Sequence, residues 1–200
     1  MRVDTKILPT FSVGGNVTVI HTNKFGRKTI SKAFNNVCTR LLTGIAYFVS
    51  GNFTTLTSYT TQSQYIPKYM RVGTGNATQD GTPAFAVSKL AQEVSIGSSF
   101  SVYTSELQPA TSSSTSVDSY GKSSITFVSY IQPGTIPQDT VLHELALYGS
   151  TYTGVVSRPL AYVYIEDGIK MSNDSVVQVL WQMVFSNAST PQSSETIQGE

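Results

Sequence analysis

The sequence predicts a mainly β protein: a β-sandwich or jelly-roll-like domain with one N-terminal amphipathic helix packed on it. From residue 94 onward, short runs of β-branched and aromatic residues alternate with turns rich in Gly, Pro, Asn and Asp. A single helical stripe precedes them. Ser and Thr fill roughly a quarter of the chain, well above ordinary usage. Several short strands, many turns and one helix are typical of this class.

The helix is predicted over residues 31–50. Ser31 can cap its first turn, and Gly51-Asn52 can end it because both residues tolerate a positive φ. Apolar residues recur between these limits at spacings of three and four, which places them on one face. That stripe consists of Phe34, Val37, Cys38, Leu41, Leu42, Ile45, Phe48 and Val49. A second, short helical piece is expected at about residues 84–93.

The strands are predicted from alternating apolar residues bounded by turn residues. Residues 176–185 form the strongest of these patterns. Further strands are expected at 69–72, within 95–108, from Ile125 onward, at 142–148 and at 155–165. Turns or loops are expected at 73–75, 76–84, 109–120, 150–154 and 166–168.

The length of 200 residues suits one large β domain with smaller appendages. We expect an N-terminal arm and helix over residues 1–52, a β-sandwich over 53–186 and a polar tail over 187–200 that is loose or ordered only by a partner. Within the first of these, residues 1–30 are expected to form an extended arm or short strands. Cys38 is the only cysteine, so an intrachain disulfide is excluded, and its apolar neighbours indicate a small core residue.

Charge is sparse and nearly balanced. Charged residues make up 12% of the chain, about half the usual share, and the net charge is +1. A polar but weakly charged surface fits a protein whose exterior is covered by neighbours, because interface cores are depleted in charge. A β protein with Thr on its solvent-facing sides would have the same composition.

No partner nucleic acid or membrane is expected. The densest basic run, at residues 24–28 with Lys32 nearby, is short and favours a turn with solvated lysines over a phosphate contact. No apolar stretch reaches transmembrane length, and the first residues lack the long apolar run of a secretory signal. We therefore expect the chain to fold in the cytoplasm.

Residues for catalysis or metal binding are few, and we predict no catalytic residue, no metal site and no cofactor. His21 and His143 are the only histidines. His143-Glu144 opens like a zinc-protease helix, but Leu147 stands where the second histidine belongs. Glycosidase chemistry needs only two carboxylates, so a glycan-degrading enzyme stays an alternative. Its candidate acids are Glu144, Glu166, Asp167 and Asp174.

Tyrosine is abundant, with eleven residues. Exposed tyrosines suit protein or glycan contacts, whereas tyrosines within strands pack across a sheet. The loop candidates for contact roles are Tyr59, Tyr65, Tyr103, Tyr120 and Tyr152.

Three ordered segments within about residues 69–186 resemble a recurring pattern of bacteriophage structural proteins of the tail and neck. The first is Tyr69-Met70-Arg71-Val72-Gly73-Thr74-Gly75, followed by Pro83 and Glu93. The second, Leu142 to Gly149, resembles a Glu-X-Gly-Leu-aromatic strand, with Ala146 in place of the small glycine. The third comprises Arg158, then Ile169-Lys170-Met171, then Leu180-Trp181-Gln182-Met183-Val184-Phe185.

This resemblance implies a virion protein, with the matched residues acting as fold determinants. Trp181 is expected in the core, and Arg158 is expected to pair with Glu144 across strands. We accordingly predict a non-enzymatic component of the tail, baseplate or neck/collar that assembles as a symmetric homo-oligomer with other virion proteins. The alternative is a receptor- or glycan-binding module at a tail fibre or baseplate tip, with Tyr103 and Tyr120 as contact residues.

Overall fold

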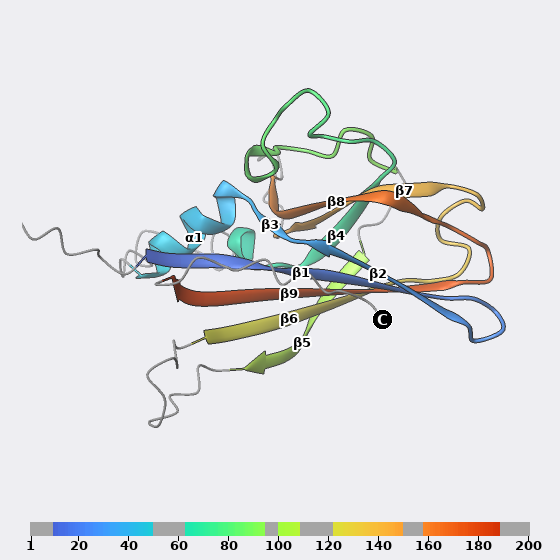
Figure 1. The fold of residues 1–200 in the computed structure, drawn as a ribbon, viewed down its shortest axis with the longest axis horizontal. Coiled ribbons are helices and arrows are strands. Elements are labelled where there is room, and N and C mark those ends of the chain that lie inside the picture. The colour runs from blue at the N-terminus through green and yellow to red at the C-terminus, as the bar shows by residue number, and fades with distance from the viewer. Residues whose placement is uncertain (1–9, 50–62, 95–99, 109–121, 150–157, 189–200) are drawn as a thin grey trace, which may run out of the picture.

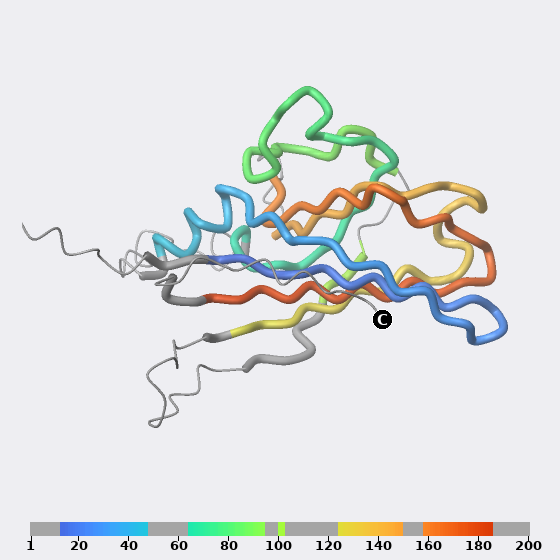
Figure 2. Tube along the Cα trace, in the orientation of Figure 1, coloured from blue at the N-terminus to red at the C-terminus, as the bar shows by residue number. Residues whose placement is uncertain are grey.

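The computed structural model of the protein describes residues 10–49, 63–94, 100–108, 122–149 and 158–188. Its described strands form one antiparallel sheet of nine strands that is nearly closed into a barrel (Figures 1 and 2). The mainly β prediction is confirmed. The sandwich or jelly-roll is not confirmed, because the described strands are joined into a single sheet.

The strand order is β2-β1-β9-β6-β5-β4-β7-β8-β3. In chain order the strands are β1 (Thr10–Thr22), β2 (Lys28–Phe34), β3 (Asn36–Val37), β4 (Tyr69–Gly73), β5 (Phe100–Gln108), β6 (Lys122–Ile131), β7 (Val141–Tyr148), β8 (Pro159–Lys170) and β9 (Val176–Ala188). The helical segments are α1 (Thr39–Val49), η2 (Ser63–Tyr65) and η3 (Ala84–Ala86).

The first and last strands of the chain lie side by side. β1 pairs with β9 along its whole length, from Thr10 opposite Ala188 to Thr22 opposite Val176. β9 in turn pairs with β6 on its other side (Figure 1). For residues 10–30, predicted as an extended arm or short strands, the structure shows strands of the same sheet, and β9 extends two residues into the predicted tail.

The barrel has a seam where β2, at one end of the strand order, faces β8 near the other end. One continuous piece of chain crosses this seam. β2 pairs with β1, and β3, one residue further on, pairs with β8. The buried Asn35 lies at the switch, where its backbone N–H donates to the Gly15 carbonyl at 2.9 Å. The seam is thus closed at the β3 end, while at the other end β2 faces β8 without strand pairing among the described residues.

The predicted helix begins later than expected. Residues 31–34 and 36–37 are extended, and α1 starts only at Thr39. Phe34, placed on the apolar stripe by its spacing, is 77% exposed, whereas Val37, Cys38 and Leu41 are buried as predicted. Pairing with β1 and β8 overrides the helical spacing at this edge.

Two other local predictions were wrong. The helix expected at about 84–93 is reduced to the single turn η3. The turn expected at Glu166-Asp167-Gly168 lies inside β8, where the register against β7 shifts between Leu142 and Glu144. Gly168 has a φ of 66°, so the turn chemistry makes an irregular bulge instead of ending the strand.

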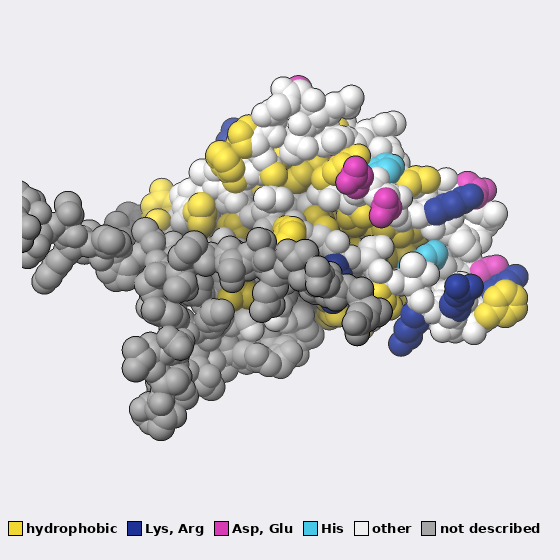
Figure 3. Space-filling model, in the orientation of Figure 1, with side chains coloured by type: hydrophobic (Ala, Val, Ile, Leu, Met, Phe, Trp, Pro, Cys, Tyr) yellow, Lys and Arg dark blue, Asp and Glu magenta, His cyan; other side chains and the backbone are white. Residues whose placement is uncertain are grey.

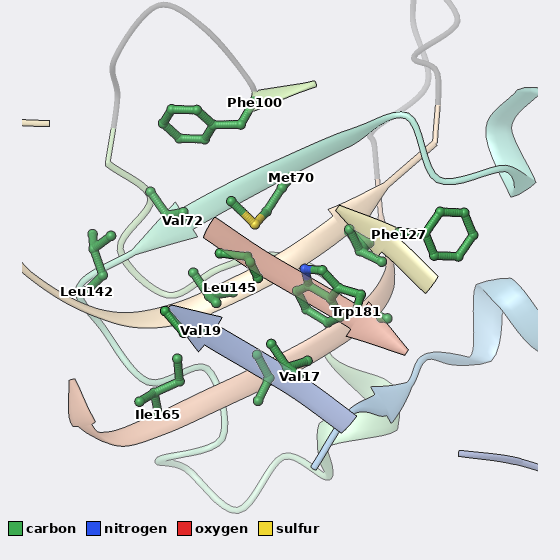
Figure 4. Packing of buried hydrophobic residues seen from close by; sticks show 14 of the residues in the cluster. Val17, Val19, Met70, Val72, Phe100, Phe127, Leu142, Leu145, Ile165 and Trp181 are labelled. Carbon is green, nitrogen blue, oxygen red and sulfur yellow. The ribbon is translucent and has the colours of Figure 1, made fainter. Parts of the chain in front are cut away.

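The strands expected at 142–148 and 176–185 are confirmed by β7 and β9. The main core lies between the facing walls of the curved sheet. Trp181 is fully buried there, as predicted, and packs with Val17, Leu145 and Phe127 from three other strands (Figure 4). The loops expected at 109–120 and 150–154 lie outside the described residues.

Candidate functional site

The two histidines lie in different surroundings. His21 is in β1, whereas His143 is in β7, with its Nδ1 3.0 Å from the Ile165 carbonyl oxygen and its ring stacked on Tyr164. In the part of the chain that the structure describes, no three His, Cys, Asp or Glu side chains come together as a metal site would require.

The four candidate carboxylates have separate roles. Glu144 is completely buried. Glu166 and Asp167 are exposed on the bulge of β8. Asp174 is an exposed partner of Lys24, with 3.7 Å between Oδ2 and Nζ. Only Glu144 is held by a set of hydrogen bonds, and all of its donors are structural groups of the protein.

Glu144 fastens the loop between β4 and β5 onto the sheet. Oε1 accepts hydrogen bonds from the Ala77 N–H at 2.7 Å and from the Tyr162 hydroxyl at 3.0 Å. Oε2 accepts from the Ala91 N–H at 3.1 Å and from the Gln92 N–H at 3.4 Å. A buried carboxylate with several donors is well satisfied, so this group ties both ends of the 74–92 excursion to β7.

Gly73 allows this carboxylate to approach the neighbouring strand. A Cβ at Gly73 would lie 2.6 Å from Glu144 Oε2 and 2.8 Å from the Gln92 carbonyl oxygen. The Thr74 N–H donates to that same carbonyl at 2.9 Å. The Gly-Thr-Gly segment and the Glu144 strand, which the sequence pattern only places in order, therefore form one structural unit.

The expected pairing of Arg158 with Glu144 is wrong. Arg158 is exposed at the start of β8, and the partners of Glu144 are Tyr162 and backbone N–H groups. Burial raises the pKa of the Tyr162 hydroxyl, and the Glu144 carboxylate raises it further, so this hydroxyl stays a donor at neutral pH. The tyrosine supplies the side-chain contact predicted for the arginine.

The buried Cys38 lies beside this unit, in a small core cluster with Ala146, Tyr148 and Tyr162. Burial raises the pKa of its thiol to about 12. The expectation of a small core residue is confirmed. A thiol that stays protonated and buried is a poor nucleophile, so Cys38 contributes packing.

A rigid hairpin tip connects β1 to β2. Asn23 Oδ1 accepts hydrogen bonds from the Phe25 and Arg27 N–H groups, each at 3.0 Å. The Gly26 N–H donates to the Asn23 carbonyl at 2.9 Å, and Gly26 has a φ of 77°. Phe25 is 83% exposed at the apex, between Lys24 and Arg27. Figure 3 shows the basic side chains gathered around a hydrophobic one at the end of this hairpin.

A recess of about 370 Å³ lies beside the hairpin, in the unpaired half of the seam. The buried apolar side chains of Val19, Ile169 and Met171 line it, together with polar groups of both walls. His21 is among the polar groups, and its Nε2 is buried without a hydrogen-bond partner among the described residues. The remaining lining residues are Thr29, Ser31, Gln138, Asp139, Gly168, Lys170 and Ser172.

A second groove, of about 580 Å³, runs between α1 and the 85–88 segment. Arg40 and Arg158 both line it, and its described lining residues include no carboxylate. Arg40 donates to Gln64 Oε1 at 2.9 Å and lies 5.6 Å from the centroid of the Tyr65 ring. This groove combines a positive charge with an aromatic wall.

Among the tyrosines proposed for contact roles, the structure describes the side chain of Tyr65. It packs on α1, with its ring centroid 6.1 Å from that of Tyr47. The side chain of Tyr103 and the residues Tyr59, Tyr120 and Tyr152 lie outside the described part. Sequence reasoning missed Phe25, although an aromatic residue inside a Gly-containing basic turn was a readable signal. The seam recess could not be predicted from the sequence, because its lining residues come from four separate segments of the chain.

Comparison of the chain with protein-family models, with curated proteins and with solved structures found no match. Among the described residues, no helix has the length and apolar character needed to cross a membrane.

Proposed function

We propose that this protein is a non-enzymatic structural component of a bacteriophage particle, in the tail, baseplate or neck/collar, and that it assembles as a symmetric homo-oligomer. The observation that carries the assembly role is the exposed aromatic tip of the β1–β2 hairpin. Phe25, at this tip, is 83% exposed, more than any other large hydrophobic residue in the part of the chain that the structure describes. An exposed aromatic side chain on a well-ordered turn is a candidate anchor for a protein partner.

The chemistry of the described residues is consistent with a structural role. Glu144 ties backbone segments together, and the other three candidate acids are exposed at the surface. The virion assignment rests on the ordered sequence pattern of residues 69–186. Its central members, Gly73 and Glu144, touch one another as fold determinants would.

The mass of the purified chain in solution tests the assembly role. Light scattering behind a sizing column is expected to give a multiple of 21.6 kDa. A well-folded monomer over a wide concentration range would contradict self-assembly. Mass spectrometry of purified phage particles tests the virion role, since a structural component is present in fixed copy number and a non-structural protein is absent.

A receptor- or glycan-binding module at a tail fibre or baseplate tip is the second candidate, favoured by the groove that contains Arg40, Arg158 and Tyr65. Aromatic rings and guanidinium groups suit acidic sugars. Arg158→Ala is expected to abolish binding to acidic glycans on an array without changing the solution mass. Unchanged glycan binding, or none in the native protein, would exclude this groove.

A further inference from the structure

We propose that two copies of the chain join by reciprocal insertion of the Phe25 hairpin tip of each into the seam recess of the other. This inference rests on the proposed self-assembly and names its contact surface. It follows from the tip and the recess being neighbours at one end of the molecule.

The tip is built to present its aromatic ring. Four hydrogen bonds fix the turn: two to Asn23 Oδ1, one to the Asn23 carbonyl, and one from the Asn23 N–H to the Arg27 carbonyl at 3.0 Å. A ring held outward by a pre-formed turn loses little conformational entropy when it is buried by a partner. Aromatic anchors of this kind dominate the energy of many interfaces.

The recess has the character of a receiving site. Its apolar lining can bury a ring, and its volume lies within the range of ordinary ligand pockets. His21 Nε2, buried without a partner, is a polar group on its wall that a second chain can satisfy. The site exists because β2 and β8 stay apart here, whereas the seam is closed at β3.

Position makes the surface self-complementary. Thr29, on the recess wall, is four residues from Phe25 in the same hairpin. A two-fold axis between a projection and an adjacent recess places each projection in the other copy's recess, which is how isologous interfaces form.

Charge supports a second copy as the occupant. The tip carries Lys24, Arg27 and Lys28, all exposed. Lys24 already pairs with Asp174 of its own chain at 3.7 Å, so Arg27 and Lys28 are the cations considered for the partner. Glu166 and Asp167 are exposed on the β8 bulge immediately before Gly168, which lines the recess. Figure 3 shows basic and acidic side chains on the same face of the molecule, at the end that carries the hairpin tip. A two-fold exchange brings the cations of each copy toward the acids of the other.

The experiment compares Phe25→Ala with Phe34→Ala, a matched control on the same hairpin that is 77% exposed and away from the recess. Sedimentation equilibrium of the native chain is expected to give twice 21.6 kDa. Phe25→Ala should raise the dissociation constant by at least about tenfold, and Phe34→Ala should leave it nearly unchanged. Circular dichroism melting should show both variants to be folded.

Thr29→Trp provides a second test, because the indole would fill the recess from its own wall. It is expected to weaken association as Phe25→Ala does, and added salt should weaken the native contact. A monomeric native chain would overturn both this inference and the self-assembly role. An oligomer unaffected by Phe25→Ala, or equally weakened by Phe34→Ala, would overturn the tip-and-recess contact and leave self-assembly standing.

Discussion

The hydroxyl of Tyr162 on β8 donates a hydrogen bond of 3.0 Å to Oε1 of Glu144 on β7, between two side chains that are both fully buried. The same carboxylate holds the N–H groups of Ala77, Ala91 and Gln92. One side chain thus determines where the long connection between β4 and β5 rests on the sheet.

Glu144→Gln is expected to lower the free energy of unfolding by about 2–4 kcal/mol, since an amide NH2 would face N–H donors and leave them unsatisfied. Chemical denaturation followed by circular dichroism measures this. Glu166→Gln, at an exposed acid, is the control and should change stability by less than about 0.5 kcal/mol. Equal effects of the two changes would show that the Glu144 hydrogen bonds contribute no stability.

Tyr162→Phe removes one donor to the same carboxylate and should cost about 1 kcal/mol. In a double-mutant cycle with Glu144→Gln the two losses should not add, because both changes act on one hydrogen bond. Strict additivity would contradict the contact.

Gly73→Ala is expected to destabilise the protein by about 1–3 kcal/mol, because the new methyl group meets Glu144 Oε2 and the Gln92 carbonyl. Gly14→Ala is the matched control: it also lies in a strand, and a Cβ there meets no atom within 4 Å. Thermal melting of both variants gives the comparison. If the Gly73→Ala protein were as stable as the Gly14→Ala protein, the segment around Gln92 would have to shift at little cost, which would contradict the prediction.

Cys38 links stability to alkaline pH. Its folded pKa of about 12 exceeds the ordinary 9.0, so the unfolded chain loses this proton first. The free energy of unfolding should therefore fall between pH 9 and 12, by up to about 1.4 kcal/mol per pH unit from this group. Cys38→Ala should flatten the profile over that window. An unchanged slope would mean that the thiol is not buried in solution.

Trp181 is the only tryptophan and is fully buried among strands of both walls. Its fluorescence should therefore report global unfolding and be nearly insensitive to acrylamide in the folded protein. Trp181→Ala should cost about 3–5 kcal/mol, as large deletions in cores do. Strong acrylamide quenching in native buffer would contradict the packing shown for this ring.

β7 and β9 were predictable because their apolar residues are dense. Nearly every side chain of β7 from Leu142 to Tyr148 is buried, and β9 buries every second side chain from Val177 to Met183. The start of the helix was not. Residues 31–37 carry helical spacing, yet they pair with β1 and β8, which lie far away in the sequence. The spacing of apolar residues within one segment cannot show which distant strands will pair with it.

The site was predictable only in part. The sequence order of the Gly73 and Glu144 segments was readable, but their contact depends on the register of β4 against β7, where Gly73 stands opposite Glu144. The partner assigned to Glu144 was wrong because it was inferred from the resemblance, whose ordered segments carry no information on which side chains touch. A buried carboxylate is equally well satisfied by a hydroxyl and backbone N–H groups.

The pairing of β1 with β9 also constrains how the chain folds. Every other strand that the structure describes lies between β1 and β9 in the sequence, so β1 meets this partner only after all of them have been made. Closing so long a loop is entropically costly and slow, as in other proteins rich in distant contacts. Until β9 is in place, Val17 and Val19 of β1 lack the strand they pair with on this side, although both are buried in the folded protein.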